Sequence, residues 1–303
     1  MSYGGAGDDR LSKNQRREAA REKARTLREE QRKKDRRSRF VLQGSLIVVS
    51  LAIIAVIVVV ITSSVRPPSA GPRNMLSDGI KIGQNLAAVP TAALQPGDAP
   101  VPSARNKSDV IDIQIFVDYQ CPVCQVFEQT NTAQIKSYLK TGAATLEIHP
   151  IAILDNRSLG QRYSSRAANA AACVANFSPN SYFDFNTLLF EEQPKENTEG
   201  LPDQKLVSIA KQAKVESLTS ITSCITDQSF KAWVTSATSR ATTGPIANSD
   251  VKKVSATPTV IINGAKFNGA ATDASAFSAA IQKAAGDTFR EDATATPSPS
   301  PAP

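Results

Sequence analysis

Two cysteines that lie two residues apart, Cys121 and Cys124, are the side chains of this sequence best suited to chemistry. Thiols at this spacing can bind a metal ion, form a structural bridge, or alternate between dithiol and disulfide. A zinc site takes about four ligands, and the chain adds two isolated cysteines and one histidine, so we expect no metal. A structural bridge across so short a loop would remove little chain entropy. The spacing therefore favours a redox couple.

The flanking segments place this pair where a strand meets a helix. Asp109–Tyr119 alternates in polarity and then becomes continuously apolar, which is typical of a central strand. A helical pattern follows to Leu139 and is stopped by Gly142. Pro122 suits the first turn of that helix, where a missing N–H group is no loss.

Cys121 should therefore lie at a helix N-terminus, where free backbone N–H groups and the helix dipole stabilise a thiolate. Cysteines in such settings have pKa values of roughly 3.5–7.5. We expect Cys121 to be the exposed nucleophile and Cys124, one turn further on, to be its buried resolving partner.

The remaining segments complete a mixed α/β pattern. Residues 143–154 form a second strand, and 158–248 read almost entirely as helices. Thr257–Gly264 is a third strand, and the Asn263–Gly264 pair predicts a hairpin to the short segment that follows. A last helix covers Asp273–Ala285. The order is β-α-β, a helical block, then β-β-α.

The stretch "IFVDYQCPVC" resembles the active-site segment of DsbA-like thiol–disulfide oxidoreductases of the membrane-anchored bacterial type. "LLFEEQP" and "VSATPTVIING" follow in the order that such proteins show. The resemblance covers Asp109 to Ala285 and implies a thioredoxin fold with an inserted α-helical domain. It implies that Pro258 is a cis-proline opposite the cysteines, with the backbone groups of Thr257 free to pair with an extended substrate. It also implies no cofactor, and re-oxidation by a quinone-linked membrane partner.

One position departs from the family pattern. The strongly oxidising members carry histidine between the cysteines, whereas the dipeptide here is Pro122–Val123. Because valine can donate neither a hydrogen bond nor a charge to the thiolate, we expect a less oxidising couple, between roughly −120 and −270 mV.

The other cysteines, Cys173 and Cys224, both fall in the helical block. They could be buried free thiols or a second, electron-relaying pair. We expect a structural disulfide, because closing a loop of about 50 residues stabilises by roughly 4 kcal/mol.

His149 could act as a base near the site, but its place at a strand end favours a structural role. Aromatic residues at helical spacing, including Trp233, should fill the core, and Asp118 has no assigned chemistry.

The N-terminal 39 residues hold 14 Lys and Arg against seven Asp and Glu, whereas the rest of the chain has 21 of each. A nucleic-acid reader would need its basic patch on the folded domain, so we expect no nucleic-acid partner. The segment Asn14–Arg39 should be helical, lying in solvent or along anionic headgroups.

The following segment, Phe40–Ile61, has no charged residue. At about 1.5 Å per residue a helix of this length crosses the roughly 30 Å hydrocarbon core of a bilayer. A buried core helix rarely lacks a polar face, and a cleaved signal peptide has a shorter apolar run. We therefore expect a single-pass anchor in the cell membrane. The basic tail keeps the N-terminus in the cytoplasm, and the rest lies outside, where disulfides form.

These expectations define the domains and a function. The function is extracytoplasmic thiol–disulfide exchange that oxidises unfolded secreted or membrane proteins through Cys121 and Cys124. The alternatives are a reductase or isomerase on the same fold, and a non-catalytic anchored module that binds peptides. The expected boundaries are a basic tail (1–39), a transmembrane helix (40–62), an extracytoplasmic linker with possible edge strands (63–108), a thioredoxin-like domain (109–154 and 251–287), the inserted helical domain (155–250) and a disordered tail (288–303).

Overall fold

The computed structural model describes residues 21–23, 25–26, 28–34, 50, 52–54, 70–107 and 109–294, and the chain divides into two units, Met1–Arg66 and Pro67–Pro303. The described residues of the first unit are helical and exposed. Among all described residues, no helix is both long enough and apolar enough to cross a bilayer. Most of the expected anchor, 40–62, lies outside the described residues.

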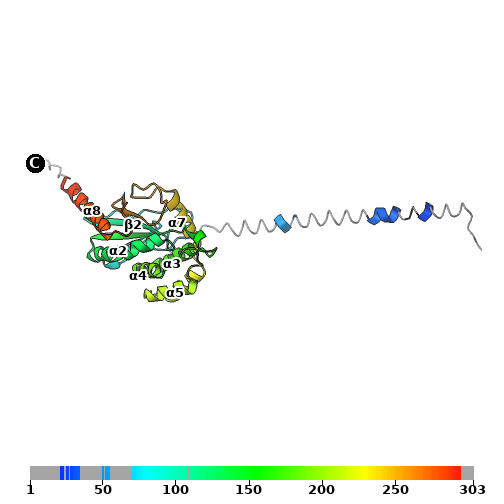
Figure 1. Ribbon diagram of the computed structural model, residues 1–303, viewed down its shortest axis with the longest axis horizontal. Helices are drawn as coiled ribbons and strands as arrows, with labels where there is room; N and C mark the ends of the chain where they lie inside the picture. The colour runs from blue at the N-terminus through cyan, green and yellow to red at the C-terminus, as the bar shows by residue number, and fades with distance from the viewer. Residues whose placement is uncertain are drawn as a thin grey trace, which may run out of the picture. The chain divides into compact units, whose positions relative to one another are not determined.

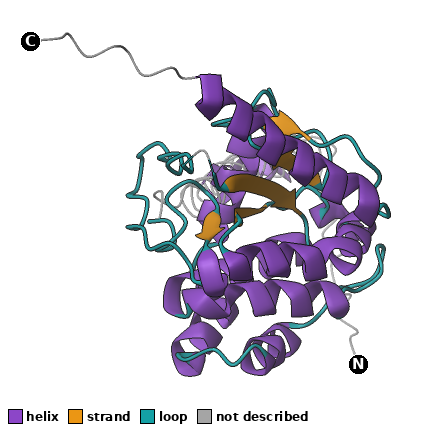
Figure 2. Ribbon diagram, turned by 90° about the vertical axis from the view of Figure 1, so that its left-hand side faces the viewer, coloured by secondary structure: helices purple, strands orange, loops and turns teal. Residues whose placement is uncertain are grey.

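A five-stranded sheet in the order β1-β3-β2-β4-β5 forms the centre of the second unit, with helices on either side of it (Figure 2). Only β2 and β3 are parallel, and they are joined through a helix, as a parallel pair requires. The remaining neighbours pair in antiparallel fashion. The strands are β1 (Ile80–Ile82), β2 (Ile111–Val117), β3 (Ala144–Pro150), β4 (Thr259–Ile262) and β5 (Ala265–Lys266).

The helices fall into two groups. One long helix joins β2 to β3 and another closes the chain, while a block of helices is inserted between β3 and β4 (Figure 1). A disulfide between Cys173 and Cys224 joins two helices of this block. The helices are η1 (Gln84–Leu86), α2 (Pro122–Thr141), η2 (Asp155–Arg157), α3 (Tyr163–Phe177), η3 (Pro179–Ser181), α4 (Tyr182–Glu191), α5 (Asp203–Gln212), α6 (Leu218–Thr226), α7 (Lys231–Thr243) and α8 (Ala274–Thr294).

The two faces of the sheet differ, because successive residues of a strand point to opposite sides. One face is apolar, and its residues, such as Ile113 and Ile148, belong to a core that includes Phe127 of α2 and Phe277 of α8. The opposite face carries a smaller apolar cluster around Phe116. That second face also bears several buried polar side chains: Gln114, Glu147, His149 and Thr259.

The order of elements is the expected one, and β4 and β5 form the hairpin expected at Asn263–Gly264. The segment expected to be a linker, 63–108, supplies the edge strand β1. Its residues from 70 onwards nevertheless pack on the domain: Met75 is fully buried, and Asn74 donates a 2.8 Å hydrogen bond to the carbonyl of Ala175 in α3. These side chains find apolar and polar partners, so this part of the segment packs as part of the folded unit.

The C-terminal helix is longer than expected. α8 runs to Thr294 rather than to Ala285, so the backbone from residue 288 is helical where a disordered tail was expected. The added residues contain no proline to stop a helix. Residues 295–303 lie outside the described residues.

Candidate functional site

Cys121 lies at the junction between β2 and α2 that the sequence predicts. It is the N-cap residue of α2, and Pro122 is the first helical residue. The four residues between strand and helix, 118–121, form a turn, in which the N–H of Cys121 donates a 2.9 Å hydrogen bond to the carbonyl of Asp118. The sulfur is thereby fixed at the positive end of the helix.

Both cysteines of the pair are free thiols, and both are buried. Cys124 is fully inaccessible, as expected. Cys121, however, exposes only 5 % of its surface and is not the exposed nucleophile that the sequence predicts. The reason is a distant segment: the Sγ of Cys121 donates a hydrogen bond to the backbone carbonyl of Thr257, 136 residues further along, at 3.2 Å.

The surroundings of Cys121 favour its thiolate and lower its pKa from the ordinary value near 9 to about 6. The largest cause is a hydrogen bond from the Cys124 thiol, and partial burial opposes it. The side chain of Thr257 and the backbone N–H groups of Cys124 and Val123 add further stabilisation. The helix N-terminus therefore acts as predicted, but the neighbouring thiol acts more strongly.

Cys124 differs from its partner in the direction of its pKa. Burial and the adjacent Cys121 raise the pKa of the Cys124 thiol well above its ordinary range. One sulfur is thus held ionised near neutral pH while the other keeps its proton. This asymmetry makes Cys121 the better leaving group and the reactive nucleophile.

The Thr257–Pro258 peptide bond is cis, as the resemblance implies. Thr257 contacts the redox couple from the opposite side of the site, through the carbonyl that accepts the Cys121 thiol hydrogen. In the protonated dithiol the Cys121 thiol occupies this carbonyl, so a Thr257 backbone that is free to pair with a substrate stays a prediction for the thiolate and disulfide forms.

The dipeptide between the cysteines points outward. Pro122 is exposed, and Val123 exposes 51 % of its surface. The isopropyl group of Val123 therefore adds no polar contact to the sulfur, and this residue influences Cys121 through its backbone N–H alone.

A buried carboxylate beneath the site has no counterpart in the sequence-based expectations. Asp118 is inaccessible to solvent and accepts hydrogen bonds from the Ser164 hydroxyl at 2.6 Å and from the N–H groups of Gln120 and Leu154, each at 2.9 Å. Burial raises its pKa to about 6, and the charge of Cys121 contributes in the same direction. Two signals were available: an acidic residue directly after a buried strand, and its place in the stretch "IFVDYQCPVC" that carries the family resemblance.

A glutamine from the helical insertion holds the same turn. The side-chain amide of Gln193 donates to the carbonyls of Tyr119 and Cys121, at 3.1 Å and 3.0 Å. These carbonyls lie on either side of Gln120 in the turn before the helix, so the insertion holds the backbone that carries the nucleophile. Gln193 lies within the stretch "LLFEEQP" that contributes to the family resemblance, but the sequence assigned it no role.

The remaining candidate residues lie away from the sulfurs. Cys173 and Cys224 form the inter-helix disulfide, and Trp233 is buried in the main core. His149 stacks on Phe116, with ring centres 4.3 Å apart, on the sheet face opposite α2. It is therefore not a base for Cys121. Among the described residues, no cluster of three or more His, Cys, Asp or Glu could hold a metal ion.

Comparisons with known proteins agree with this geometry. A family model described as thioredoxin matches residues 106–283. The oxidised structure of DsbA from Mycobacterium tuberculosis is 27% identical and superposes with a TM-score of 0.51, covering 72% of this chain and 100% of that one. The reduced form of the disulfide bond oxidoreductase DsbG from the same organism is 26% identical with a TM-score of 0.50, covering 78% and 99%.

Two further similarities are narrower. Oxidised BdbD from Bacillus subtilis, 20% identical with a TM-score of 0.50 over 73% of this chain and 100% of that one, shares the fold. The serine/threonine-protein kinase PknE of Mycobacterium tuberculosis is 29% identical over 126 residues, which are 41% of this chain. The match spans 18% of PknE, so this chain corresponds to about a fifth of that relative's length.

Proposed function

The chain belongs to the thioredoxin family, and we propose that this thiol–disulfide oxidoreductase of the DsbA-like type oxidises cysteine pairs in secreted or membrane proteins. The observation that carries the proposal is the pairing of two sulfurs with opposite pKa shifts at a helix N-terminus. A thiol with a low pKa leaves readily from a mixed disulfide, which favours transfer of the bond to a substrate.

The reaction starts from the Cys121–Cys124 disulfide. A substrate thiolate attacks the Sγ of Cys121, forming a mixed disulfide and releasing the sulfur of Cys124, which takes up a proton. A second substrate thiolate then attacks the substrate sulfur of the mixed disulfide and expels Cys121 as a thiolate. Two electrons pass from the substrate to the enzyme, and the dithiol seen in the structure is the resulting state.

Thr257 takes part by binding rather than by chemistry. In the disulfide form Cys121 has no S–H group, so the Thr257 carbonyl that it occupies in the dithiol becomes available. An extended substrate can then donate a backbone N–H to that carbonyl, as in strand addition.

The setting of this reaction is extracytoplasmic, with residues 40–62 as a single membrane anchor and the basic tail in the cytoplasm. The uncharged segment Phe40–Ile61 supports the anchor, and the Cys173–Cys224 disulfide fits an oxidising compartment. Re-oxidation of the dithiol requires a two-electron acceptor, for which we propose a quinone-linked membrane protein. The anchor keeps the enzyme beside that partner.

The test uses the full-length protein in detergent and a reduced, unfolded substrate protein that contains one cysteine pair. The oxidised enzyme should form the substrate disulfide, and Cys124→Ala should accumulate a mixed disulfide through Cys121. Cys121→Ser is the matched control and should trap nothing. If the wild-type protein leaves the substrate reduced, the oxidase proposal fails.

Two alternatives predict different results in cells. A reductase or isomerase would hold Cys121 and Cys124 reduced in the cell, which alkylation of freshly lysed cells measures. A non-catalytic binding module would keep its cellular function after Cys121→Ser.

A further inference from the structure

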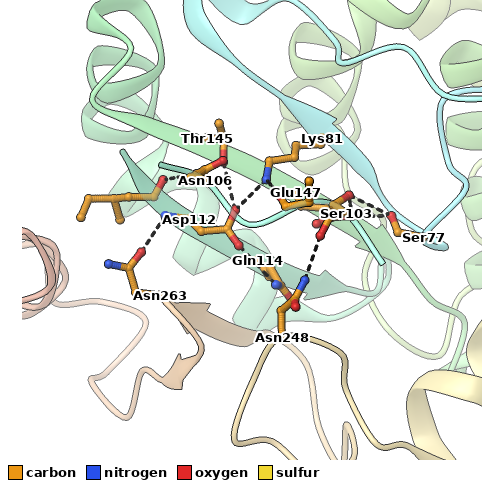
Figure 3. A network of polar contacts seen from close by, with 12 residues as sticks. Ser77, Lys81, Ser103, Asn106, Asp112, Gln114, Thr145, Glu147, Asn248 and Asn263 are labelled. Atoms are coloured by element: carbon orange, nitrogen blue, oxygen red, sulfur yellow. Dashed lines mark hydrogen bonds and ion pairs between the residues drawn. The ribbon is translucent and has the colours of Figure 1, made fainter. Parts of the chain in front are cut away.

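A cavity of about 290 Å³ lies on the sheet face that points away from α2 and the cysteines. Its floor is formed by β2 and β3, and its walls by α7, by the loop after α7 and by the segment around Ser103. Figure 3 shows Ser77, Ser103, Gln114, Glu147 and Asn248 converging at this face from separate parts of the chain. Its size is at the lower end of small-molecule sites.

The cavity contains a buried carboxylate whose nearest basic atom is the Nε2 of His149, 3.7 Å away. Glu147 exposes 2 % of its surface and accepts hydrogen bonds from the hydroxyls of Ser77 and Ser103. In the described part of the chain, no lysine or arginine forms an ion pair with it. The ammonium group of Lys81, which is opposite Glu147 in the strand register, instead binds Asp112 at 3.2 Å. A buried charge of this kind calls for a cationic or donor partner.

A second polar group faces the same space. The Nε2 atom of His149 is buried and has no hydrogen-bond partner. It lies 3.7 Å from the Oε1 atom of Glu147, which is too long for a direct hydrogen bond. The ring cannot easily move closer to Glu147. It stacks on Phe116, and it packs so closely on Gly79 that a Cβ at that position would lie 2.5 Å from it. A donor group placed between the two side chains would satisfy both of them.

The other residues that line the cavity indicate what else a ligand must contain. The other charged groups, Arg240 and Asp78, neutralise each other through two hydrogen bonds of 2.6 Å and 2.7 Å. The remaining walls are largely apolar and include Phe116, Ile151 and Ile246. The site therefore has one carboxyl group without a lysine or arginine partner among the described residues, at one end of an apolar space.

We propose that this cavity binds a small primary ammonium compound with an apolar body. The ammonium group donates hydrogen bonds to Glu147 and to the Nε2 atom of His149, while the apolar body packs against Phe116 and Ile246. This site is separate from the redox couple, and the proposal does not depend on the direction of disulfide exchange.

The test exploits the fact that His149 is the single histidine of the chain. The full-length protein in detergent, labelled with carbon-13 at histidine, is titrated with phenethylammonium and observed by NMR. We expect a saturable shift of the His149 ring resonances. The neutral analogue phenethyl alcohol and the anion 3-phenylpropionate should bind at least about tenfold more weakly, because each lacks the charge that complements Glu147.

Three variants complete the experiment. Glu147→Gln should weaken phenethylammonium binding by about tenfold or more, whereas Asp184→Asn, which changes an exposed carboxylate elsewhere, should not. Ala247→Trp fills the cavity from an exposed position and tests the site even where Glu147→Gln fails to fold. The proposal is overturned by the absence of a saturable shift, by equal affinity for the three compounds, or by unchanged affinity in a folded Glu147→Gln or Ala247→Trp protein.

Discussion

Replacing Cys124 by alanine removes the donor that contributes most to the low pKa of Cys121. A hydrogen bond to a charged group is worth about 1.5–3 kcal/mol, and one pKa unit corresponds to about 1.4 kcal/mol. The pKa of Cys121 should therefore rise from about 6 by about one to two units. At pH 7 the thiolate fraction would fall from about nine-tenths to between about one-half and one-tenth.

The assay is the rate of alkylation by iodoacetamide as a function of pH, followed by intact mass. Because Cys173 and Cys224 are bridged, Cys121 is the sole free thiol of the variant. Cys124→Ser is the matched control, since its hydroxyl can still donate to the thiolate, and its midpoint should stay below that of the alanine variant. Midpoints are compared rather than rates, because a thiolate of lower pKa is also less nucleophilic.

Two results would refute this reasoning. Equal midpoints near pH 6 in the alanine and serine variants would mean that backbone N–H groups and Thr257 suffice to hold the thiolate. A midpoint near pH 9 in the wild-type protein would mean that Cys121 titrates as an ordinary thiol, and the proposed leaving group would be lost.

Three further predictions concern stability and are measured by urea denaturation. The reduced protein should gain stability relative to Cys121→Ser as the pH rises from about 6 to about 9. Over this range Cys121 is ionised in the folded protein, whereas its thiol still binds a proton in the unfolded chain. A stability difference independent of pH would contradict this. Gln193→Ala should lower the free energy of unfolding by about 1–2 kcal/mol through two lost hydrogen bonds, and Gln193→Glu, which cannot donate, should be no better. The double variant Cys173→Ala/Cys224→Ala should lose about 4 kcal/mol, and an unchanged value would show that the bridge is energetically neutral.

Local patterns were sufficient for the elements and for the position of the redox pair. A proline after the first cysteine, an apolar strand before it and Gly142 after the helix together define the β2–α2 unit. The Asn263–Gly264 pair likewise indicated the β4–β5 hairpin without any tertiary information. In both places the backbone preference and the packing favour the same structure.

The features of the site that escaped prediction depend on contacts between distant segments. The burial of Cys121 requires the carbonyl of Thr257, and the burial of Asp118 requires Ser164 from α3. The helical end of α8 was missed for a different reason. Residues 288–294 precede a polar, proline-containing tail, and they were predicted to be disordered together with it. Periodicity reports which side of an element is covered, but not which segment covers it.

The recessed position of the Cys121 sulfur imposes a selection on the proteins that can react with it. A thiol on the rigid surface of a folded protein would contact the protruding Val123 before its sulfur could reach Cys121, which exposes only 5 % of its surface. A flexible, unfolded chain can bend so that its thiol reaches the Cys121 sulfur. Under the proposed oxidase reaction, a substrate would be selected by the flexibility of its chain rather than by a sequence motif, and it would no longer react once it had folded.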